Sequence, residues 1–315
     1  MQIPILAIVG PTASGKSHVA MECAEAFGAE ILSCDSVQVY REFSIGCAKP
    51  TLAEQSRVRH HLIDVADWHE DFDAQRYRQL AGEALREIAQ HGKQGILCGG
   101  TGLYLRALRY GLVSSAPADP QVRAILDREE QLRPGSLYTR LQRIDPESAA
   151  GIDPRNLVRV VRALEIHILT GEPASGVRKR HGFSSEEIPM RIVALRWPPK
   201  RMKQRIKRRV EQMLTAGLLE EVEALLSAGV TPQARAMRSV GYRQAWEVIA
   251  GQQPRDALLE RIVKATWAYA RRQMTWFRRE RGVTWVDVTS GEDAAEQVSQ
   301  IFCCLAQEHA AKSGR

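Results

Sequence analysis

The segment from Gly10 to Ser17 is the first part of the chain whose residue types and spacing indicate chemistry. Its sequence, GPTASGKS, satisfies the spacing GxxxxGK[S/T], follows an apolar run and precedes a helical pattern. Glycines let such a loop curl so that backbone N–H groups point inward, while the lysine reaches phosphate oxygens and the hydroxyl ligates magnesium. We therefore predict a diphosphate-binding loop in which Lys16 contacts the outer oxygens and Ser17 is a Mg²⁺ ligand. The loop residues are Gly10, Pro11, Thr12, Ala13, Ser14, Gly15, Lys16 and Ser17.

The loop by itself does not distinguish a nucleoside triphosphate from a simple organic diphosphate. The sequence has no guanine-reading NKxD motif, and no apolar run ends in the acidic pair of an ATPase magnesium site. The identity of the ligand therefore depends on the rest of the chain.

Two further segments follow apolar runs, where the ligands of open α/β sheets bind. The first, Ser33–Tyr40, contains the carboxylate of Asp35, which is open to three interpretations: a general base, a helix cap or a magnesium ligand. The second, Gly99–Tyr104, contains Thr101 in a glycine-rich turn, and a simple tight connection is its first interpretation. In a parallel sheet both Asp35 and Thr101 approach the mouth of the phosphate loop.

The elements that position these residues alternate between strands and helices. Strand-like runs are followed by helical patterns from His18 and over Asp73–Gln90, and this alternation is typical of a parallel sheet. We predict an α/β fold with a P-loop NTPase-like three-layer core, a parallel sheet and a small all-helical insertion domain. The expected strands are Ile3–Val9, Glu30–Cys34, His61–Val65, Gly95–Cys98, Ile192–Trp197 and Thr284–Val288.

The insertion is expected at 115–190, and its start lies within a turn-rich stretch at 114–120. Helical segments begin near Val122, Leu137 and Asn156, and strand character returns only near Ile192. The predicted core therefore comprises 1–114 and 191–300, with a polar tail at 305–315. Long helices are expected over Met202–Ser227 and Arg255–Arg279.

Positive charge is concentrated in the later helices and the insertion. The formal net charge of the 315 residues is +7, and excess lysine and arginine favour polyanions. In Arg255–Arg279, cations alternate with aromatic side chains that can stack on unpaired bases, although aromatic residues at helical spacing are more often part of a core. We expect RNA binding. The basic positions between 196 and 209 are Arg196, Lys200, Arg201, Lys203, Arg205, Lys207, Arg208 and Arg209.

Composition sets the remaining limits. With 44% hydrophobic and 26% charged residues the sequence is typical of a globular protein, and no apolar run is long enough to cross a bilayer. The six cysteines form no zinc-like spacing, so we expect them to be reduced and mostly buried. Since no leader pattern precedes the phosphate loop, we predict a cytoplasmic protein, and without heptads we predict a monomer.

With these residues assembled, the chain resembles the bacterial tRNA dimethylallyltransferases, also called tRNA isopentenyltransferases. The resemblance covers nearly everything except the tail. It rests on seven ordered blocks: GPTASGKS at 10–17, DSVQVYR at 35–41, IGCAKP at 45–50, HHLIDV at 60–65, GGTGLY at 99–104, RVVRALE at 159–165 and SVGYRQAW at 239–246.

The resemblance implies transfer of a dimethylallyl group from its diphosphate to the exocyclic amine of the adenosine 3′ to a tRNA anticodon. Lys16, Asp35 and Thr101 would be catalytic, with Asp35 as the base and Thr101 on the target nucleotide; Arg209, and secondarily Arg205, would assist at the diphosphate. Mg²⁺ would be the cofactor, and the anticodon stem-loop and dimethylallyl diphosphate the partners. The implied tRNA contacts are Asp35, Ser36, Val37, Gln38, Thr101, Arg123, Val158, Arg159, Val160, Val161, Arg162, Arg238, Ser239, Val240, Gly241, Tyr242 and Arg243.

Two other functions compete with this interpretation. A small-molecule P-loop kinase would use ATP and employ Asp35 as its base, but it leaves the insertion and the basic helices unexplained. A non-catalytic RNA-binding protein with the loop as a nucleotide switch gives Asp35 and Thr101 no task. Prenyl transfer is the function that uses all of these features.

Overall fold

The structure, a computed structural model, describes residues 4–112, 118–181, 186–289, 293–301 and 303–304. It divides into two compact units, Met1–Arg109 with Glu187–Arg315, and Tyr110–Glu186. The division falls a few residues before each expected boundary of the insertion. The expected tail at 305–315, the start of the first strand at Ile3 and most of the turn-rich stretch at 114–120 lie outside the described residues.

A parallel six-stranded sheet forms the centre of the first unit, in the order β3-β2-β4-β1-β5-β6. Within the described residues all strand pairs of this sheet are parallel, as the alternation of strands and helices predicts. The strands are β1 (Ile5–Val9), β2 (Glu30–Cys34), β3 (His60–His61), β4 (Gly95–Gly99), β5 (Met190–Arg196) and β6 (Val283–Asp287).

The register of the sheet brings three candidate segments to one edge. Val9 at the end of β1 pairs with Gly99 at the end of β4, and Gly99 also pairs with Cys34 at the end of β2. The segments that follow these strands therefore leave the sheet side by side. They are the phosphate loop, the segment from Asp35 and the turn with Thr101.

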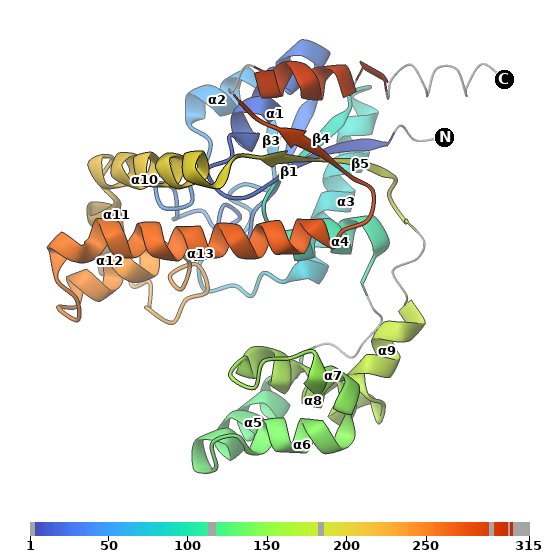
Figure 1. The fold of residues 1–315 in the computed structure, drawn as a ribbon, viewed down its shortest axis with the longest axis vertical. Coiled ribbons are helices and arrows are strands. Elements are labelled where there is room, and N and C mark those ends of the chain that lie inside the picture. Colours follow the sequence, from blue (N-terminus) through green and yellow to red (C-terminus); the bar gives the residue numbers. More distant parts are fainter. Residues whose placement is uncertain (1–3, 113–117, 182–185, 290–292, 302, 305–315) are drawn as a thin grey trace. The chain divides into compact units, whose positions relative to one another are not determined.

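Helices cover both faces of this sheet and complete three layers (Figure 1). In sequence order the helices of the first unit are α1 (Lys16–Phe27), α2 (Leu52–Arg57), α3 (Ala74–Gln90), α4 (Gly102–Tyr110), α10 (Pro199–Thr215), α11 (Leu218–Ser227), α12 (Tyr242–Ile249), the 3₁₀ turn η1 (Arg255–Ala257) and α13 (Leu258–Arg278).

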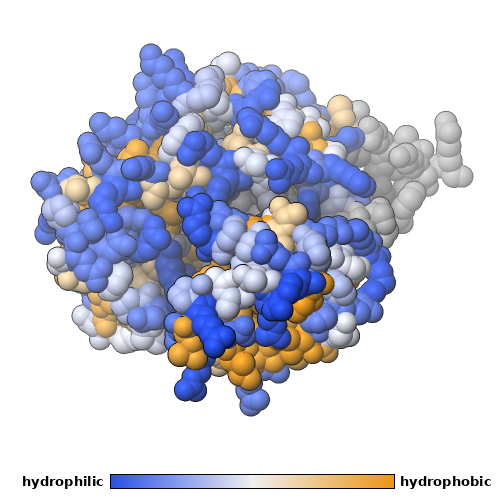
Figure 2. Space-filling model, turned by 60° about the horizontal axis from the view of Figure 1, so that its bottom comes forward, coloured by the Kyte–Doolittle hydropathy of each residue, from blue (hydrophilic) through white to orange (hydrophobic). Residues whose placement is uncertain are grey.

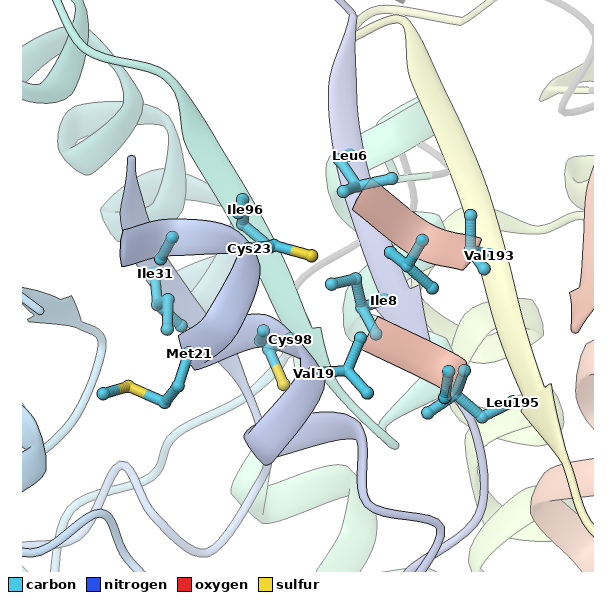
Figure 3. Close-up of a cluster of buried hydrophobic side chains, with 14 of the residues drawn as sticks. Leu6, Ile8, Val19, Met21, Cys23, Ile31, Ile96, Cys98, Val193 and Leu195 are labelled. Atoms are coloured by element: carbon cyan, nitrogen blue, oxygen red, sulfur yellow. The ribbon is translucent and has the colours of Figure 1, made fainter. Parts of the chain in front are cut away.

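One hydrophobic core of the first unit lies between α1 and one face of the sheet. Because strand side chains alternate, Leu6 and Ile8 share this face, where Figure 3 shows them with Val19 and Cys23 of α1. The opposite face meets α3, since a Cβ on Gly95 would lie within 3.6 Å of Leu85 and Ile88. Figure 1 draws α13 on the side of the sheet away from α1.

Two expected elements differ from those observed. The helix predicted over Met202–Ser227 is two helices, α10 and α11, because Gly217 has φ +95° and turns the chain between them. The strand predicted over His61–Val65 was also too long. Leu62 and Asp64 take left-handed φ values of 65° and 58°, which are incompatible with an extended strand, so β3 ends at His61.

The second unit consists of five helices in its described part. They are α5 (Pro120–Leu132), α6 (Ser136–Ile144), α7 (Pro146–Ala150), α8 (Leu157–Thr170) and α9 (Ala174–His181). Asp119 caps α5 by accepting hydrogen bonds from the N–H groups of Gln121 and Val122, and Pro120 occupies the first turn. The unit has its own core, centred on Leu126, Leu137, Leu141, Val160 and Leu164.

The cysteines only partly follow expectation. Cys23, Cys34 and Cys98 are buried, Cys47 is half-buried, and Cys303 and Cys304 are exposed near the end of the described chain; all of them are free thiols. No helix within the described ranges combines the length and apolar character needed to cross a membrane.

Candidate active site

The phosphate loop has the backbone geometry of an anion-binding site. Gly15 at φ 91° precedes α1, and Ala13 adopts a left-handed φ of 65°. Gly15 provides no side-chain cap, so the first N–H groups of α1 remain directed at the loop. The buried Ser14 Oγ has no hydrogen-bond partner among the described residues. The loop therefore presents donors that only a ligand or water satisfies.

Trp197 and Arg205 hold the carbonyl side of this loop. Trp197 donates from Nε1 to the Ser14 carbonyl at 2.8 Å, and Arg205 donates from Nε to the Ala13 carbonyl at 2.9 Å. The guanidinium of Arg205 also stacks on Trp197, with Cζ 4.3 Å from the ring centroid. With its carbonyls bound in this way, the loop keeps its N–H groups toward the ligand side.

Gln273 of α13 connects the phosphate loop with the glycine-rich turn. Its Oε1 accepts from the Thr12 N–H at 2.9 Å, and its Nε2 donates to the Gly100 carbonyl at 3.0 Å. A Cβ on Gly100 would lie 2.2 Å from Nε2, and one on Gly102 would lie 2.3 Å from the ring of Trp276. These two glycines therefore permit the close packing of α13 on the turn.

Two half-buried cations, Lys16 and Arg209, face the loop. Burial is the largest influence on Lys16 and lowers its pKa, with Arg209 adding to the effect and Asp35 opposing it. Burial likewise lowers the pKa of Arg209, again against the attraction of Asp35. The only hydrogen bond of Lys16 within the described chain is a long one, 3.5 Å from Nζ to the Pro11 carbonyl. An incoming anion would relieve the desolvation of both cations.

Asp35 lies directly beyond β2 and faces this positive charge. Its Oδ1 accepts hydrogen bonds from the N–H groups of Val37 at 2.9 Å and Gln38 at 3.3 Å. No donor within the described parts of the chain contacts Oδ2. The carboxylate thus does two things at once: one oxygen caps the following turn, and the other is available for chemistry.

Thr101 is joined to the Asp35 segment rather than to the phosphate loop. Its N–H donates to the Cys34 carbonyl at 3.1 Å, and its Oγ1 accepts from the Ser36 N–H at 3.2 Å. A Cβ on Gly99 would lie 2.1 Å from the Cys34 carbonyl oxygen, so the strands carrying these segments approach closely there. Thr101 therefore lies beside Asp35 and fixes the backbone that follows it.

A cavity of about 340 Å³ brings together many of the candidate residues of the first unit, but Thr101 is not among the residues that line it. It is open to the P-loop side chains, to the Asp35 segment and to residues of α10, the 238–241 segment and α13. An apolar part of its wall includes Val210, Met213 and Ile262. The predicted site residues that line it are Thr12, Lys16, Ser17, Asp35, Ser36, Val37, Gln38, Arg209, Arg238, Ser239, Val240 and Gly241.

A second, wider cavity of about 1100 Å³ opens on the other side of the phosphate loop. Lys16, Ser17 and Arg209 border both cavities. Its wall is strongly basic, with Arg201, Arg205, Arg208 and Lys49. Positive charge on α10, which the sequence associated with RNA, therefore lies largely beside the phosphate loop.

Several expected tRNA contacts lie elsewhere. Tyr242 is fully buried and its hydroxyl contacts Glu221, so its side chain supports the fold and does not reach a ligand in this structure. The side chains of Val160 and Val161 belong to the core of the second unit, because α8 turns this face inward. Arg243 is exposed on α12, and its Nε lies 3.8 Å from Oε1 of Glu247.

The arginines of the second unit surround one buried carboxylate. Glu165 is completely buried; it accepts from Nε of Arg123 at 2.8 Å, from Nη1 of Arg162 at 2.5 Å and from the Asp119 N–H at 2.8 Å. Both guanidiniums remain partly exposed. Val158 and Arg159 are exposed on the first turn of α8.

Exposed apolar side chains accompany these arginines. Those of the second unit are Ile125, Leu132, Leu157, Val158, Ile168 and Leu169. Figure 2 shows an apolar area on an otherwise largely hydrophilic face. The exposed surface of α5 and α8 therefore offers both charged and apolar contacts.

Sequence reasoning missed three residues that organise the site. Gln273 had a recognisable signal, a glutamine at helical spacing with the buried Ile262, Thr266 and Phe277 of α13. Trp197 and Glu221 had none, because their contacts with the Ser14 carbonyl and with residues 44–46 join segments far apart in the sequence. Of the aromatic residues in α13, Tyr269 lines the cavity whereas Phe277 is core.

Comparison with known proteins gives a consistent result. A family model described as IPP transferase matches residues 38–280. The chain is 44% identical over 289 residues to tRNA dimethylallyltransferase 1 of Citrifermentans bemidjiense, which covers 91% of this chain and 92% of that protein. It is 45% identical over 278 residues to tRNA dimethylallyltransferase of Sorangium cellulosum, covering 87% of each.

Solved structures are similar over almost the whole chain. The tRNA isopentenylpyrophosphate transferase of Bacillus halodurans superimposes with a TM-score of 0.71 at 32% identity, covering 99% of this chain and all of that one. A eukaryotic dimethylallyltransferase acting on tRNA gives a TM-score of 0.79 at 26% identity, covering 99% of this chain and 80% of that one.

Proposed function

Because the chain belongs to the IPP transferase family, we propose that it transfers a dimethylallyl group from dimethylallyl diphosphate to an adenosine of tRNA. The acceptor is the exocyclic amine of the adenosine 3′ to the anticodon, and the products are N6-dimethylallyladenosine and diphosphate. One observation carries this proposal: a single cavity joins the phosphate loop and its two half-buried cations to the Asp35 carboxylate, one oxygen of which has no donor among the described residues. The relatives named above are tRNA dimethylallyltransferases and agree with it.

The donor's diphosphate binds the phosphate loop from Gly10 to Ser17. Its charge is complemented by the N–H groups at the start of α1, by the Ser14 hydroxyl, which has no partner in the described parts of the chain, and by the cations of Lys16 and Arg209. The same cations stabilise the charge that develops on the leaving group as its C–O bond breaks. The apolar residues of the cavity wall, including Val210 and Met213, suit the hydrocarbon part of the donor.

The donor set around Ser17 fits Mg²⁺ rather than a metal held by protein side chains alone. Within the described ranges no group of three His, Cys, Asp or Glu side chains is arranged to hold a metal ion. Ser17 borders both cavities, so its hydroxyl, the diphosphate oxygens and water would form the coordination shell, as is common for Mg²⁺. When bound, the ion supplies positive charge to the departing diphosphate.

Asp35 acts as the general base. The adenine amine is a weak nucleophile, so removal of its proton as the new N–C bond forms lowers the barrier. One N–C bond forms, one C–O bond breaks, and the amine proton passes to the Asp35 carboxylate. Because Oδ1 is held by the Val37 and Gln38 N–H groups, Oδ2 is the oxygen that accepts the proton.

Thr101 and residues 36–38 contact the target nucleotide beside Asp35. The adenosine must leave the stack of the anticodon loop to reach a cavity of this kind, which is base flipping. Arg238 and Ser239 line the same cavity and take part in holding the nucleotide. Arg123, Val158, Arg159 and Arg162 of the second unit bind the anticodon stem-loop through its phosphates and sugars.

We propose that the enzyme acts as a monomer, since the sequence carries no coiled-coil heptads. The substrate tRNA places the reaction in the cytoplasm. A P-loop kinase would use the same loop and carboxylate, but it leaves the helical second unit and the basic helices without a role.

The experiment that separates these functions is a prenylation assay. Purified protein, Mg²⁺ and dimethylallyl diphosphate are incubated with an anticodon stem-loop that carries adenosine after the anticodon, and the nucleosides are analysed by mass. We expect a mass gain of one dimethylallyl group on that adenosine and release of diphosphate. Phosphate transfer from ATP without prenylation would identify a kinase instead.

A further inference from the structure

The segment from Ser44 to Ala48 is held by one carboxylate that plays no part in the chemistry described above. Glu221, in the first turn of α11, accepts hydrogen bonds from three consecutive backbone N–H groups. The distances are 2.5 Å from Ser44, 3.0 Å and 3.1 Å from Ile45 to the two oxygens, and 3.2 Å from Gly46. A charged acceptor for three amides binds far more firmly than an ordinary loop contact.

Tyr242 completes this arrangement from α12. Its hydroxyl donates to Glu221 at 3.1 Å and accepts from the Gly46 N–H at 3.1 Å. Its ring is fully buried and packs edge-on against Phe43, with centroids 4.9 Å apart. A Cβ on Gly46 would lie 2.5 Å from this ring, so the segment approaches Tyr242 as closely as glycine allows.

The other side of the segment faces the active site. Gln38 donates from Nε2 to the carbonyls of Cys47 at 3.3 Å and Ala48 at 3.1 Å, while its Oε1 accepts from the Ser33 hydroxyl at 2.8 Å. Gly46, Cys47 and Ala48 line the cavity that contains Asp35, and Ser44, Ile45 and Ala48 border the wider basic cavity. The segment is therefore a wall shared by the two cavities.

We propose that Glu221 and Tyr242 are positioning residues: they hold the wall Ser44–Ala48 so that the acceptor amine and the donor carbon align. Neither residue is among those that line the two cavities described above. The proposal rests on the proposed function and adds residues to it. It assigns a common role to two sequence blocks, 45–50 and 239–246, which pack against each other. Loss of the carboxylate removes the acceptor of the Ser44 and Ile45 N–H groups. Loss of the hydroxyl removes the link that Tyr242 makes between the Gly46 N–H and Glu221. Either change frees the wall to shift.

A change in the alignment of the reacting groups should lower turnover more than it lowers the affinity for the donor, because the phosphate loop by itself holds the diphosphate. Tyr242→Phe keeps the ring against Phe43 and removes only the hydroxyl. We expect kcat for prenylation to fall about tenfold. The Kd for dimethylallyl diphosphate, measured by calorimetry without tRNA, should stay within about twofold of that of the unmodified protein.

Matched variants separate positioning from general destabilisation. Tyr40→Phe removes another buried hydroxyl, which contacts the Glu70 carbonyl and not the wall, and should leave kcat unchanged. Glu221→Gln should reproduce the loss of kcat, whereas Glu220→Gln, on the neighbouring exposed position of the same helix turn, should not. Melting temperatures of all four variants are measured alongside.

A double variant tests the path through the wall. Gln38→Ala removes the hydrogen bonds that hold the wall on the side of the active site. If both residues act through the wall, the fold-loss of kcat in the double variant with Tyr242→Phe should be smaller than the product of the two single fold-losses. Three results would each overturn the positioning role while leaving prenyl transfer intact. They are single-variant losses of kcat that multiply in the double variant, an unchanged kcat in Tyr242→Phe and Glu221→Gln, and a loss of donor affinity as large as the loss of kcat. An unmodified protein that transfers no prenyl group would overturn the proposed function as well.

Discussion

Replacing Asp35 with asparagine separates its two structural roles. Oδ1 caps the turn by accepting from Val37 and Gln38, and the other oxygen has no donor among the described residues. Asparagine keeps an acceptor oxygen for the two N–H groups and loses the ability to take a proton. We therefore expect Asp35→Asn to fold and bind tRNA normally and to fail in the chemical step.

The size of the effect follows from the role of the carboxylate. A positioned general base contributes about 100-fold to 10,000-fold in rate, which corresponds to about 3 to 5 kcal/mol of transition-state stabilisation. Asp35→Ala loses the base and the cap together. Two backbone hydrogen bonds are each worth about 0.5 to 1.5 kcal/mol, so alanine should also lower the free energy of unfolding by about 1 to 3 kcal/mol.

Single-turnover prenylation of the anticodon stem-loop, with enzyme in excess, measures the chemical step directly. Stem-loop affinity is measured separately by anisotropy, and stability by chemical denaturation. We expect at least a 100-fold loss of rate in both variants, with loss of stability only in alanine. If Asp35→Asn reacts at nearly the normal rate while Asp35→Ala is slow and unstable, Asp35 is a structural cap and the base lies elsewhere.

Four other substitutions test separate parts of the structure. Burial lowers the pKa of Lys16, so its side chain should lose its proton at a pH below the usual lysine range. The affinity for dimethylallyl diphosphate, measured by calorimetry across the alkaline range, should therefore begin to fall there as the pH rises. Lys16→Arg should remove this pH dependence. Arg162→Gln should weaken stem-loop binding and reduce the slope of log K against log salt by about 0.7 to 0.9; an unchanged slope places this side chain off the RNA. Gly102→Ala puts a Cβ against the ring of Trp276 and should destabilise the protein by about 1 to 3 kcal/mol. Gly82→Ala, in the interior of α3 with no atom near its Cβ, should stabilise it by about 0.4 to 1 kcal/mol, and denaturant unfolding compares the two.

The local part of the site was predictable from short stretches of sequence. GPTASGKS indicates a curled loop and a helix start because glycine, lysine and serine at that spacing serve one backbone geometry. Asp35 and Thr101 were expected near the loop because parallel strands end at a common edge, and the pairing of Val9 and Cys34 with Gly99 agrees. In each case the decisive contacts lie within a few residues or follow from sheet topology.

Charge and aromatic content were less informative. The basic run of α10 suggested RNA, yet Arg205 binds the Ala13 carbonyl, and Arg209 is half-buried and lines the same cavity as Asp35. Tyr242 lay within a block implied to touch tRNA, but its side chain is part of the core. A residue type shows what a side chain can bind, whereas burial and direction decide what it does bind.

By itself, then, the sequence determined the phosphate loop, the parallel α/β plan and the carboxylate beside it, because these depend on spacing within a segment and on the order of strands. Only the tertiary structure decided which distant groups hold that site. Trp197 and Gln273 reach the loop across more than 180 positions in the chain, and Glu221 reaches Ser44 across 177. Hydrogen bonds of this kind depend on how the packed helices bring remote side chains to backbone groups, and no local pattern records that.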